Sequence, residues 1–344
     1  MKSNNKEPFK KPDISLRQAF GDALVYWAKK YNNFVVFDAD VASGTGVQIF
    51  KNKFPRRFYQ FGISEQAMMS AAAGRAAASN GRTIPIVTTF AVFATMRAHE
   101  QIRTFIAYPK LKVIIASSHV GLDVGPDGPT AQATEDLATM RAIPNMTVIA
   151  PADYNQMIAA FPKLLECKGP VYLRTGRSPA PHVYPQIPSF KIGRADILRK
   201  GNDVSIIACG VMVARSLIAA ELLEQKGISA EVINVSTIKP LDKKTIIGSS
   251  LKTGAVVTAE DHNILGGLGG AVSELLSKNQ PTIQEFIGVK DIFAESGDPQ
   301  HLAKKYKLTS SDISKLAITA LKRKFPPKPF TTKNMNHQYK LLKS

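Results

Sequence analysis

The sequence predicts an α/β protein with two domains, each a mainly parallel sheet flanked by helices. Short apolar runs of strand length alternate with segments of helical period along most of the 344 residues, as in α/β proteins with parallel sheets. The longest apolar runs, such as 113–116 and 204–209, are far shorter than the roughly 20 residues of a membrane span. Four prolines from Pro179 to Pro188 predict an extended linker over 178–189, which divides the two domains.

The first domain is expected over 13–177 and the second over 190–324. Strand candidates of the first domain lie at 34–37, 84–88, 112–117, 147–150 and 171–173. Those of the second domain lie at 204–208, 231–235, 255–258 and 282–288. The run Thr309-Ser310-Ser311-Asp312 has the pattern of a capping box and predicts a last helix that extends to about Lys322.

The formal net charge of +18 is concentrated at the two ends of the chain. Residues 1–12 carry a net charge of +3 and residues 322–344 a net charge of +7, so we expect a basic N-terminal tail over 1–12 and a basic C-terminal tail over 325–344. Such tails favour solubility or docking to an acidic partner. No zinc-ligand spacing or RNA-binding aromatic motif accompanies them, so the sequence does not favour a nucleic-acid partner.

The N-terminal residues and the cysteines together predict a cytoplasmic protein. Residues 1–6 are not followed by an apolar segment, so no secretory signal and no membrane partner are expected. Cys167 and Cys209 show no pairing pattern, which is typical of buried thiols in a reducing compartment.

The carboxylate of Glu65 is the first candidate for chemistry. It stands among apolar and small residues, in the run Phe61-Gly62-Ile63-Ser64-Glu65-Gln66-Ala67-Met68, directly before an alanine-rich segment. Packing against Phe61, Ile63 and Met68 would desolvate the carboxyl group and raise its pKa, so that it could donate a hydrogen bond near neutral pH. In the alternative interpretation, Glu65 only begins a helix that Ser64 caps.

Polar and aromatic side chains collect after the predicted strands of the first domain. In open α/β sheets, ligands bind at the carboxyl ends of the strands. The residues found there are Asp40 after the first strand, Phe90 and Phe93 after the second, His119 and Asp127 after the third, and Arg177 after the fifth. We therefore expect a ligand site at this edge of the sheet.

The loop from His119 to Gln132 is the most informative of these segments. Its glycines and prolines, as in Gly125-Pro126-Asp127-Gly128-Pro129, restrict the backbone and fix the positions of one imidazole and one carboxylate. Taken alone, His119 could be a structural histidine, and Asp127 with Gly128 could simply form a turn. Together on one rigid loop, they favour a site for a polar substrate.

Three motifs in this order and spacing resemble the transketolase family. They are Phe61 to Gln66, the run Thr89-Phe90-Ala91-Val92-Phe93, and Gly125 to Thr130 with His119 upstream. Residues 13–177 resemble the pyrimidine-binding domain of transketolases, and residues 190–322 resemble their C-terminal domain. The resemblance implies thiamine diphosphate as the cofactor. It also implies transfer of a two-carbon ketol unit from a ketose phosphate to an aldose phosphate, a reaction of the pentose phosphate pathway.

The resemblance assigns site residues to the cofactor and to the substrate. It implies that Glu65 hydrogen-bonds the aminopyrimidine ring and activates the cofactor, and that His119 is the second catalytic residue. The residues with an implied cofactor contact are Asp40, Glu65, Phe90, Phe93 and Met96. The residues with an implied substrate contact are Arg17 and Arg177 at the sugar phosphate, and His119 and Asp127 at the sugar hydroxyls.

The chain departs from the family pattern at three positions and lacks one domain. Gly44, Met96 and Ala131 stand where the family often has serine, tyrosine and histidine, which affects the range of sugars and the binding of phosphate. Neither Gly21-Asp22-Ala23 nor Pro126-Asp127-Gly128 begins the Gly-Asp-Gly motif with which transketolases bind diphosphate and metal. We therefore expect no metal site in this chain. A separate N-terminal subunit is expected to hold Mg2+ or Ca2+, with two copies of each chain in a heterotetramer.

Other functions stay open at this point. The beta subunit of a 2-oxo acid dehydrogenase and a deoxyxylulose-phosphate synthase-like enzyme are the alternatives within enzymes, although the loop from His119 to Thr130 fits transketolase better. A regulatory or binding chain is the alternative outside enzymes. The runs Glu260-Asp261-His262 and 266–270 lie where a strand gives way to a helix. Because the full dinucleotide motif is absent, close packing at a helix start is the favoured explanation.

Overall fold

The first sheet of the computed structural model, which describes residues 14–324, has seven strands. Their order across the sheet is β12-β6-β7-β5-β4-β2-β3, and all neighbours are parallel except β12 and β6. The strands are β2 (Phe34–Asp38), β3 (Phe58–Gln60), β4 (Ile84–Phe90), β5 (Ile114–Ser118), β6 (Thr147–Ile149), β7 (Val171–Arg174) and β12 (Thr237–Lys239).

The second sheet has five strands in the order β14-β13-β10-β11-β9. Only β9 runs antiparallel to its neighbour. The strands are β9 (Asp196–Arg199), β10 (Val204–Ala208), β11 (Ala230–Asn234), β13 (Ala255–Asn263) and β14 (Ile283–Val289). The predicted fold class, two mainly parallel sheets flanked by helices, is confirmed.

Every predicted strand overlaps a strand of the two sheets, whereas β3, β9 and β12 of these sheets are not predicted. Each of these three has only three or four residues, too few to show a strand periodicity. β12 belongs to the chain after the predicted linker, yet it pairs with β6 of the first sheet. The C-terminal part of the chain therefore contributes a strand to the first sheet.

The predicted linker is anchored at its beginning. β8 (Pro179–Ala180) pairs antiparallel with β1 (Ile14–Ser15). The backbone N–H of Arg17 also donates to the carbonyl of Gly176 at 3.0 Å. These contacts hold the start of the first helix, which carries Arg17, beside the segment that carries Arg177.

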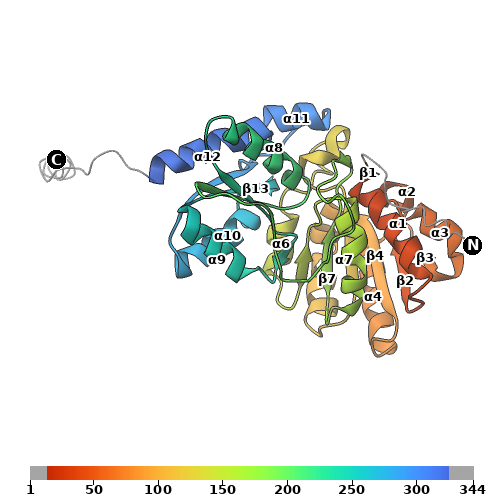
Figure 1. Cartoon of the computed structure of the whole chain (residues 1–344). Helices are drawn as coiled ribbons and strands as arrows, with labels where there is room; N and C mark the ends of the chain where they lie inside the picture. The colour runs from red at the N-terminus through yellow and green to blue at the C-terminus, as the bar shows by residue number, and fades with distance from the viewer. Residues whose placement is uncertain (1–13, 325–344) are drawn as a thin grey trace, which may run out of the picture.

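Helices cover both faces of the first sheet and flank the second (Figure 1). Those of the first half are α1 (Leu16–Ala28), α2 (Ala42–Thr45), α3 (Gln48–Lys53), α4 (Glu65–Ala78), α5 (His99–Gln101), α6 (Asp136–Ala142) and α7 (Tyr154–Glu166). Those of the second half are α8 (Met212–Glu224), α9 (Lys243–Thr253), α10 (Leu268–Asn279), α11 (Pro299–Lys305) and α12 (Ser310–Lys324). Two π-helical segments, η2 (Phe93–Arg97) and η3 (Ile102–Ala107), flank α5, and a 3-10 segment, η4 (Gly121–Asp127), follows β5.

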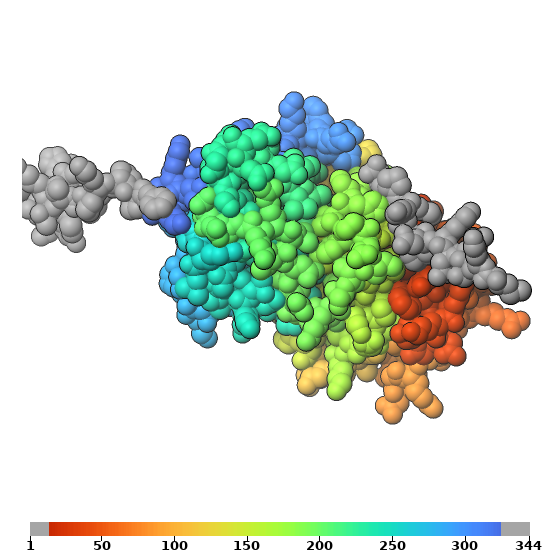
Figure 2. Space-filling view, in the orientation of Figure 1, coloured from red at the N-terminus to blue at the C-terminus, as the bar shows by residue number. Residues whose placement is uncertain are grey.

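One apolar core extends through both domains. Residues of α4 and α6, including Met68 and Leu137, belong to the same buried cluster as Ile207 of β10 and Val272 of α10. Helices α1 and α7 cover the opposite face of the first sheet in a separate cluster. Figure 2 shows the green, teal and blue C-terminal domain lying directly against the yellow-green end of the first domain. The two domains therefore share one buried apolar interface.

The predicted capping box at the start of α12 is confirmed. The Asp312 N–H donates to Thr309 Oγ1 at 3.3 Å, and the Thr309 N–H donates to Asp312 Oδ2 at 3.2 Å. Among the described residues, no helix is long and apolar enough to cross a membrane. The predicted basic tails over 1–12 and 325–344 lie outside the described residues.

Candidate active site

The predicted site residues follow strands that are neighbours in the first sheet. β7, β5, β4 and β2 lie side by side, so the loops at their carboxyl ends adjoin one another. Arg177 follows β7, His119 follows β5, Phe90 ends β4, and Asp40 follows β2. Helix α4 begins at Glu65, just after the edge strand β3. The fold thus brings the candidate residues to one edge of one sheet.

His119 packs against the aromatic residues of the neighbouring loop. Its imidazole stacks on Phe90 with ring centroids 3.6 Å apart, and Phe90 stacks on Phe93 at 5.8 Å. His119 has a φ of 61°, a left-handed conformation that is uncommon outside glycine and often marks functional sites. The backbone after β5 therefore turns the imidazole onto the rings of Phe90 and Phe93, which we call the aromatic wall.

The electrostatic surroundings of His119 keep its ring neutral. Burial, together with the positive charges of Arg17 and Arg177, lowers the pKa of His119 to about 3. Nδ1 lies 2.9 Å from Ser118 Oγ, and Nε2 lies 3.5 Å from Asp127 Oδ2. A neutral ring that accepts at Nδ1 from the Ser118 hydroxyl presents an Nε2–H toward the Asp127 carboxylate.

The two predicted phosphate-binding arginines lie beside this histidine. Arg177 lies 3.4 Å from Asp127 and donates to the carbonyl of Val124. Arg17 donates to the carbonyl of Gly44 at 2.8 Å. Burial and the neighbouring Arg177 lower the pKa of Arg17. Two guanidinium groups that repel each other favour an anion between or beside them. The structure thus gathers Arg17, His119, Asp127 and Arg177 into one cluster.

Glu65 is buried, but its surroundings differ from those predicted. The residue is 2% exposed and is the first residue of α4, whereas the Ser64 side chain makes no capping bond. Met68 is buried in the core, yet Ile63 is 77% exposed and supplies no desolvation. Instead, Arg97 Nη1 lies 2.9 Å from both carboxylate oxygens of Glu65. The buried carboxylate therefore faces a guanidinium group rather than the wholly apolar surroundings that the sequence predicts.

Asp40 and Met96 lie at the margin of the site. Asp40 is exposed, has a φ of 63°, and uses its backbone N–H to donate to Gln60 Oε1 at 2.9 Å. Met96 belongs to η2 and is 44% exposed. Within residues 14–324, neither side chain joins the contacts among His119, Asp127 and Arg177. Their cofactor contacts stay a prediction.

The C-terminal domain holds the loop that carries His119 and Asp127. The carboxylate of Asp261, in β13, accepts from the backbone N–H groups of Leu122 at 2.9 Å and Asp123 at 3.1 Å. A Cβ placed on Gly121 would lie 2.3 Å from the Asp261 carboxylate, so only glycine allows this approach. Asp261 therefore fixes the beginning of η4, two residues after His119.

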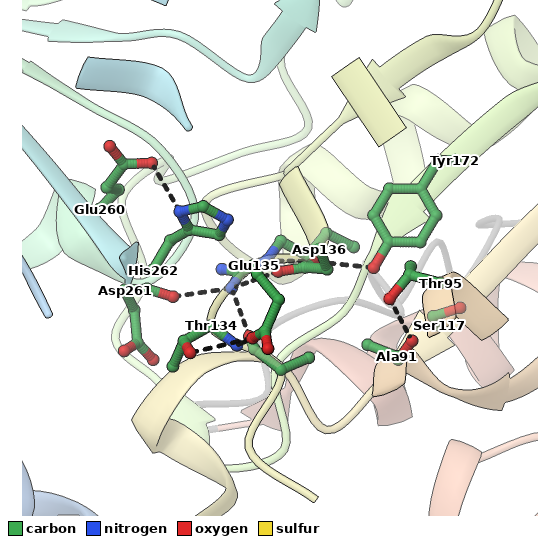
Figure 3. Close-up of polar contacts among 12 residues, drawn as sticks. Ala91, Thr95, Ser117, Thr134, Glu135, Asp136, Tyr172, Glu260, Asp261 and His262 are labelled. Carbon is green, nitrogen blue, oxygen red and sulfur yellow. Dashed lines mark hydrogen bonds and ion pairs between the residues drawn. The ribbon is translucent and has the colours of Figure 1, made fainter. Parts of the chain in front are cut away.

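A buried polar network continues from Asp261 into the first domain. Arg174 donates to the backbone carbonyl of Asp261 at 2.7 Å and pairs with Asp136 at 2.9 Å. Tyr172 donates to the same Asp136 carboxylate at 2.7 Å. Figure 3 shows Glu260, Asp261 and His262 facing Thr134, Glu135 and Asp136. Because every step of this network is buried, it fixes the two domains relative to each other.

Asp123 is a second residue beside the site that the sequence does not single out. Its carboxylate accepts from the Ser178 N–H at 2.8 Å, which ties η4 to the segment after Arg177. Burial and the nearby charge of Asp261 raise the pKa of Asp123. No local pattern identifies Asp123 or Asp261, because their roles depend on a contact between distant parts of the chain.

The glycine-rich run after β13 is explained by close packing, as predicted. Glu260 accepts from the N–H groups of Leu268 at 2.7 Å and Gly269 at 2.8 Å, at the start of α10. A Cβ on Gly267 would lie 2.1 Å from the Glu260 carboxylate. A cavity of about 620 Å³, lined by Lys191, Arg194, Glu231 and other residues of the C-terminal domain, contains none of the candidate site residues.

The chain offers partners for an aminopyrimidine ring. Glu65 supplies a buried carboxylate for a ring nitrogen, and the half-buried rings of Phe90 and Phe93 supply flat apolar faces. Gly44 leaves room for Phe90, since a Cβ there would lie 2.8 Å from that ring. In the part of the chain that the structure describes, no group of three or more His, Cys, Asp or Glu side chains could hold a metal ion.

The fold and this edge define a two-domain α/β protein with candidate site residues at the carboxyl ends of the strands of its first sheet. The transketolase pyrimidine-binding domain family matches residues 12–182, and the transketolase C-terminal domain family matches residues 193–313. The chain therefore belongs to the transketolase family.

Several relatives have the same two-domain extent as this chain. A transketolase C-terminal section from Methanocaldococcus jannaschii is 42% identical, with 90% of this chain and 96% of that one covered. A 6-deoxy-6-sulfo-D-fructose transketolase subunit from a Clostridium species is 40% identical, with 90% and 95% covered. A solved split-gene transketolase, an inactive beta4 tetramer, is 45% identical, with 90% and 98% covered and a TM-score of 0.83.

Against a full-length transketolase, the chain matches only one part. It is 35% identical to human transketolase over 88% of its own length and 48% of that protein. These relatives confirm the resemblance, predicted from the sequence, to the C-terminal chain of a split transketolase.

Proposed function

We propose that this chain is the C-terminal subunit of a split, thiamine-diphosphate-dependent transketolase. The reaction is transfer of a two-carbon ketol unit from a ketose phosphate to an aldose phosphate. The convergence of Arg17, His119, Asp127 and Arg177 beside the Phe90 ring carries the proposal. The proposal is supported because side chains suited to an anion and to sugar hydroxyls lie next to aromatic rings suited to an aminopyrimidine.

Each residue has a role that follows from its chemistry. Thiamine diphosphate, when bound, supplies the carbon centre that carries the two-carbon unit. Glu65 holds the pyrimidine ring at one nitrogen, and Phe90 and Phe93 pack against the ring faces. His119 is neutral at physiological pH, so its Nε2–H can donate a hydrogen bond to a sugar hydroxyl and assist proton transfer there.

The remaining groups orient the substrate. Asp127 accepts a hydrogen bond from a sugar hydroxyl, and its position is fixed by His119 and Arg177. Arg17 and Arg177 bind the anionic end of the sugar, a task that suits the guanidinium fork. Since one relative is named for a sulfonated ketose, both phosphate and sulfonate sugars belong in the substrate test.

The proposal includes an N-terminal partner subunit that carries the Gly-Asp-Gly motif and holds Mg2+ or Ca2+. Apolar side chains just before α4, on η2, on η3 and just after η3 are exposed, which suits a surface covered by another chain. They are Ile63 at 77%, Met96 at 44%, Phe105 at 44% and Tyr108 at 82%. We propose two copies of each chain in the active assembly. The tetramer formed by a 45% identical relative supports self-association.

A cytoplasmic location is part of the proposal. Cys167 and Cys209 are both free thiols, as a reducing compartment requires. Only Cys209 is fully buried, so the prediction of two buried thiols is wrong for Cys167, which directly follows α7 and is half-buried.

Product analysis of the reconstituted pair tests the function. The chain is co-expressed with a candidate subunit that carries Gly-Asp-Gly, and two-carbon transfer from xylulose 5-phosphate is measured with and without thiamine diphosphate. Transfer that requires both chains and the cofactor supports the proposal. Decarboxylation of pyruvate without ketol transfer would instead identify the beta subunit of a 2-oxo acid dehydrogenase or a deoxyxylulose-phosphate synthase-like enzyme.

A further inference from the structure

We propose that Arg97 occupies the pyrimidine position in the lone chain and must move away before the cofactor binds. The inference rests on the proposed function of Glu65 and deepens it. It concerns an arginine that no motif in the sequence singles out. Two independent contacts of this one side chain carry it.

Arg97 contacts both groups that an aminopyrimidine needs. Its Nη1 lies 2.9 Å from each oxygen of Glu65. Its guanidinium lies over the ring of Phe93, with the central carbon 4.4 Å from the ring centroid. A guanidinium is flat, donates hydrogen bonds in its plane and stacks on aromatic faces. An aminopyrimidine beside Glu65 uses the same carboxylate and the same aromatic face, so the two groups exclude each other.

The position of Arg97 allows it to leave without unfolding the chain. The residue ends η2, a π-helical segment, and such segments are common at functional sites. Its side chain is 44% exposed, whereas that of Glu65 is 2% exposed. The arginine can therefore rotate into solvent while the carboxylate stays in place.

The exchange has an energetic consequence. Glu65 is almost fully buried, and removing its partner alone would leave an unpaired buried carboxylate, which is costly. A cofactor ring that hydrogen-bonds Glu65 supplies a replacement partner. Arg97 thus stabilises the empty site and competes with the cofactor, so the lone chain binds the pyrimidine weakly.

Binding of an aminopyrimidine fragment to the full-length chain tests this competition. The probe is 4-amino-5-hydroxymethyl-2-methylpyrimidine, which carries no diphosphate and needs no metal, and its affinity is measured by calorimetry. The Arg97→Ala chain is expected to bind at least 10-fold more tightly than wild type. Adding Glu65→Gln to Arg97→Ala should remove the gain. Arg103→Ala, at an exposed arginine of η3, serves as the matched control and should bind as wild type does.

The outcomes separate this inference from the proposed function. Equal binding by wild type and Arg97→Ala, with weaker binding when Glu65→Gln is present, overturns the inference and leaves the role of Glu65 standing. If no variant binds the fragment, and the assembled complex also fails to bind thiamine diphosphate, both the inference about Arg97 and the proposed function of the chain are overturned. A crystal structure of the assembled wild-type complex covers the case in which Arg97→Ala does not fold. Arg97 should then have left Glu65, and an intact Arg97–Glu65 contact beside a bound pyrimidine contradicts the inference.

Discussion

The imidazole of His119 lies flat against the phenyl ring of Phe90, with ring centroids 3.6 Å apart. This contact joins the proposed proton-transfer residue to the proposed cofactor wall, so that a shift of one ring moves the other. Gly44 lies against both rings. A Cβ built there would be 2.8 Å from Phe90 and 3.7 Å from His119.

Replacing Gly44 by serine should displace the two rings. The added atoms overlap Phe90, and overpacking of this kind costs about 1–3 kcal/mol of unfolding free energy. We expect Gly44→Ser to lower stability in urea unfolding and to raise KM for the ketose substrate several-fold. Gly74→Ala is the control, because nothing lies within 4 Å of a Cβ at Gly74. It should stabilise α4 by about 0.5–1 kcal/mol. A Gly44→Ser chain with unchanged stability and KM would contradict the packing described.

The lowered pKa of His119 predicts a pH dependence of stability. Its pKa in the folded chain is about 3, against an ordinary value of 6.5, so the unfolded state binds the proton more tightly. The contribution of His119 to the free energy of unfolding is fully present above pH 6.5 and is lost as the pH falls from 6.5 toward 3. The slope from this one group is at most about 1.4 kcal/mol per pH unit. Urea unfolding of His119→Gln between pH 7 and pH 4 should show a shallower loss than wild type. The surface variant His301→Gln should follow the wild-type curve, and parallel curves for all three proteins would refute the assignment.

Asp123 gives the opposite pH dependence. Burial and Asp261 raise its pKa in the folded chain, so its contribution to stability is best at low pH and is lost as the pH rises through the raised pKa. An asparagine can still accept the Ser178 N–H through its amide oxygen and carries no charge. Asp123→Asn should therefore raise the melting temperature at pH 7 to 8, and the gain should vanish toward pH 3. A lower melting temperature across the whole range would show that the charge itself is needed.

Asp261 tests whether the C-terminal domain positions the substrate loop. Asp261→Ala leaves the N–H groups of Leu122 and Asp123 without their acceptor, at a cost of about 1–3 kcal/mol for each buried group. We expect lower stability and, in the assembled enzyme, a larger rise in KM than fall in kcat. The exposed Asp291 provides the matched control, since Asp291→Ala removes a bond to Asn263 and leaves the contacts of Asp261 with the loop in place. An unchanged KM for Asp261→Ala would show that the contact between the domains does not position the substrate-binding residues.

The sequence predicts those features whose causes are local. The capping box at Thr309 and Asp312 and most strands of the two sheets follow from short patterns. The edge that gathers His119, Phe90 and Arg177 follows from the order of parallel strands. Arg97 and Asp261 are different, because they act on Glu65 and Leu122 across 32 and 139 residues of chain. Such pairings arise from tertiary packing and leave no periodic signal.

The prediction for Glu65 shows the same limit. Its burial and its position at the start of α4 are predicted from its neighbours in sequence. The charge that it faces is not, because Arg97 reaches it from a π-helical turn that no pattern indicates. β12 is missed for a related reason, since three residues join a sheet that lies mostly in the other half of the chain.

Activity of the Glu65→Gln variant in the complete assembly tests the central claim most directly. The chain is combined with its Gly-Asp-Gly subunit, thiamine diphosphate and Mg2+, and two-carbon transfer between sugar phosphates is followed. Because a positioned acid or base contributes roughly 100-fold to 10,000-fold, Glu65→Gln should lose at least about 100-fold in kcat. Glu100→Gln, at an exposed glutamate of α5, should keep its activity. Full transfer activity of Glu65→Gln in a folded, cofactor-bound assembly would contradict the account.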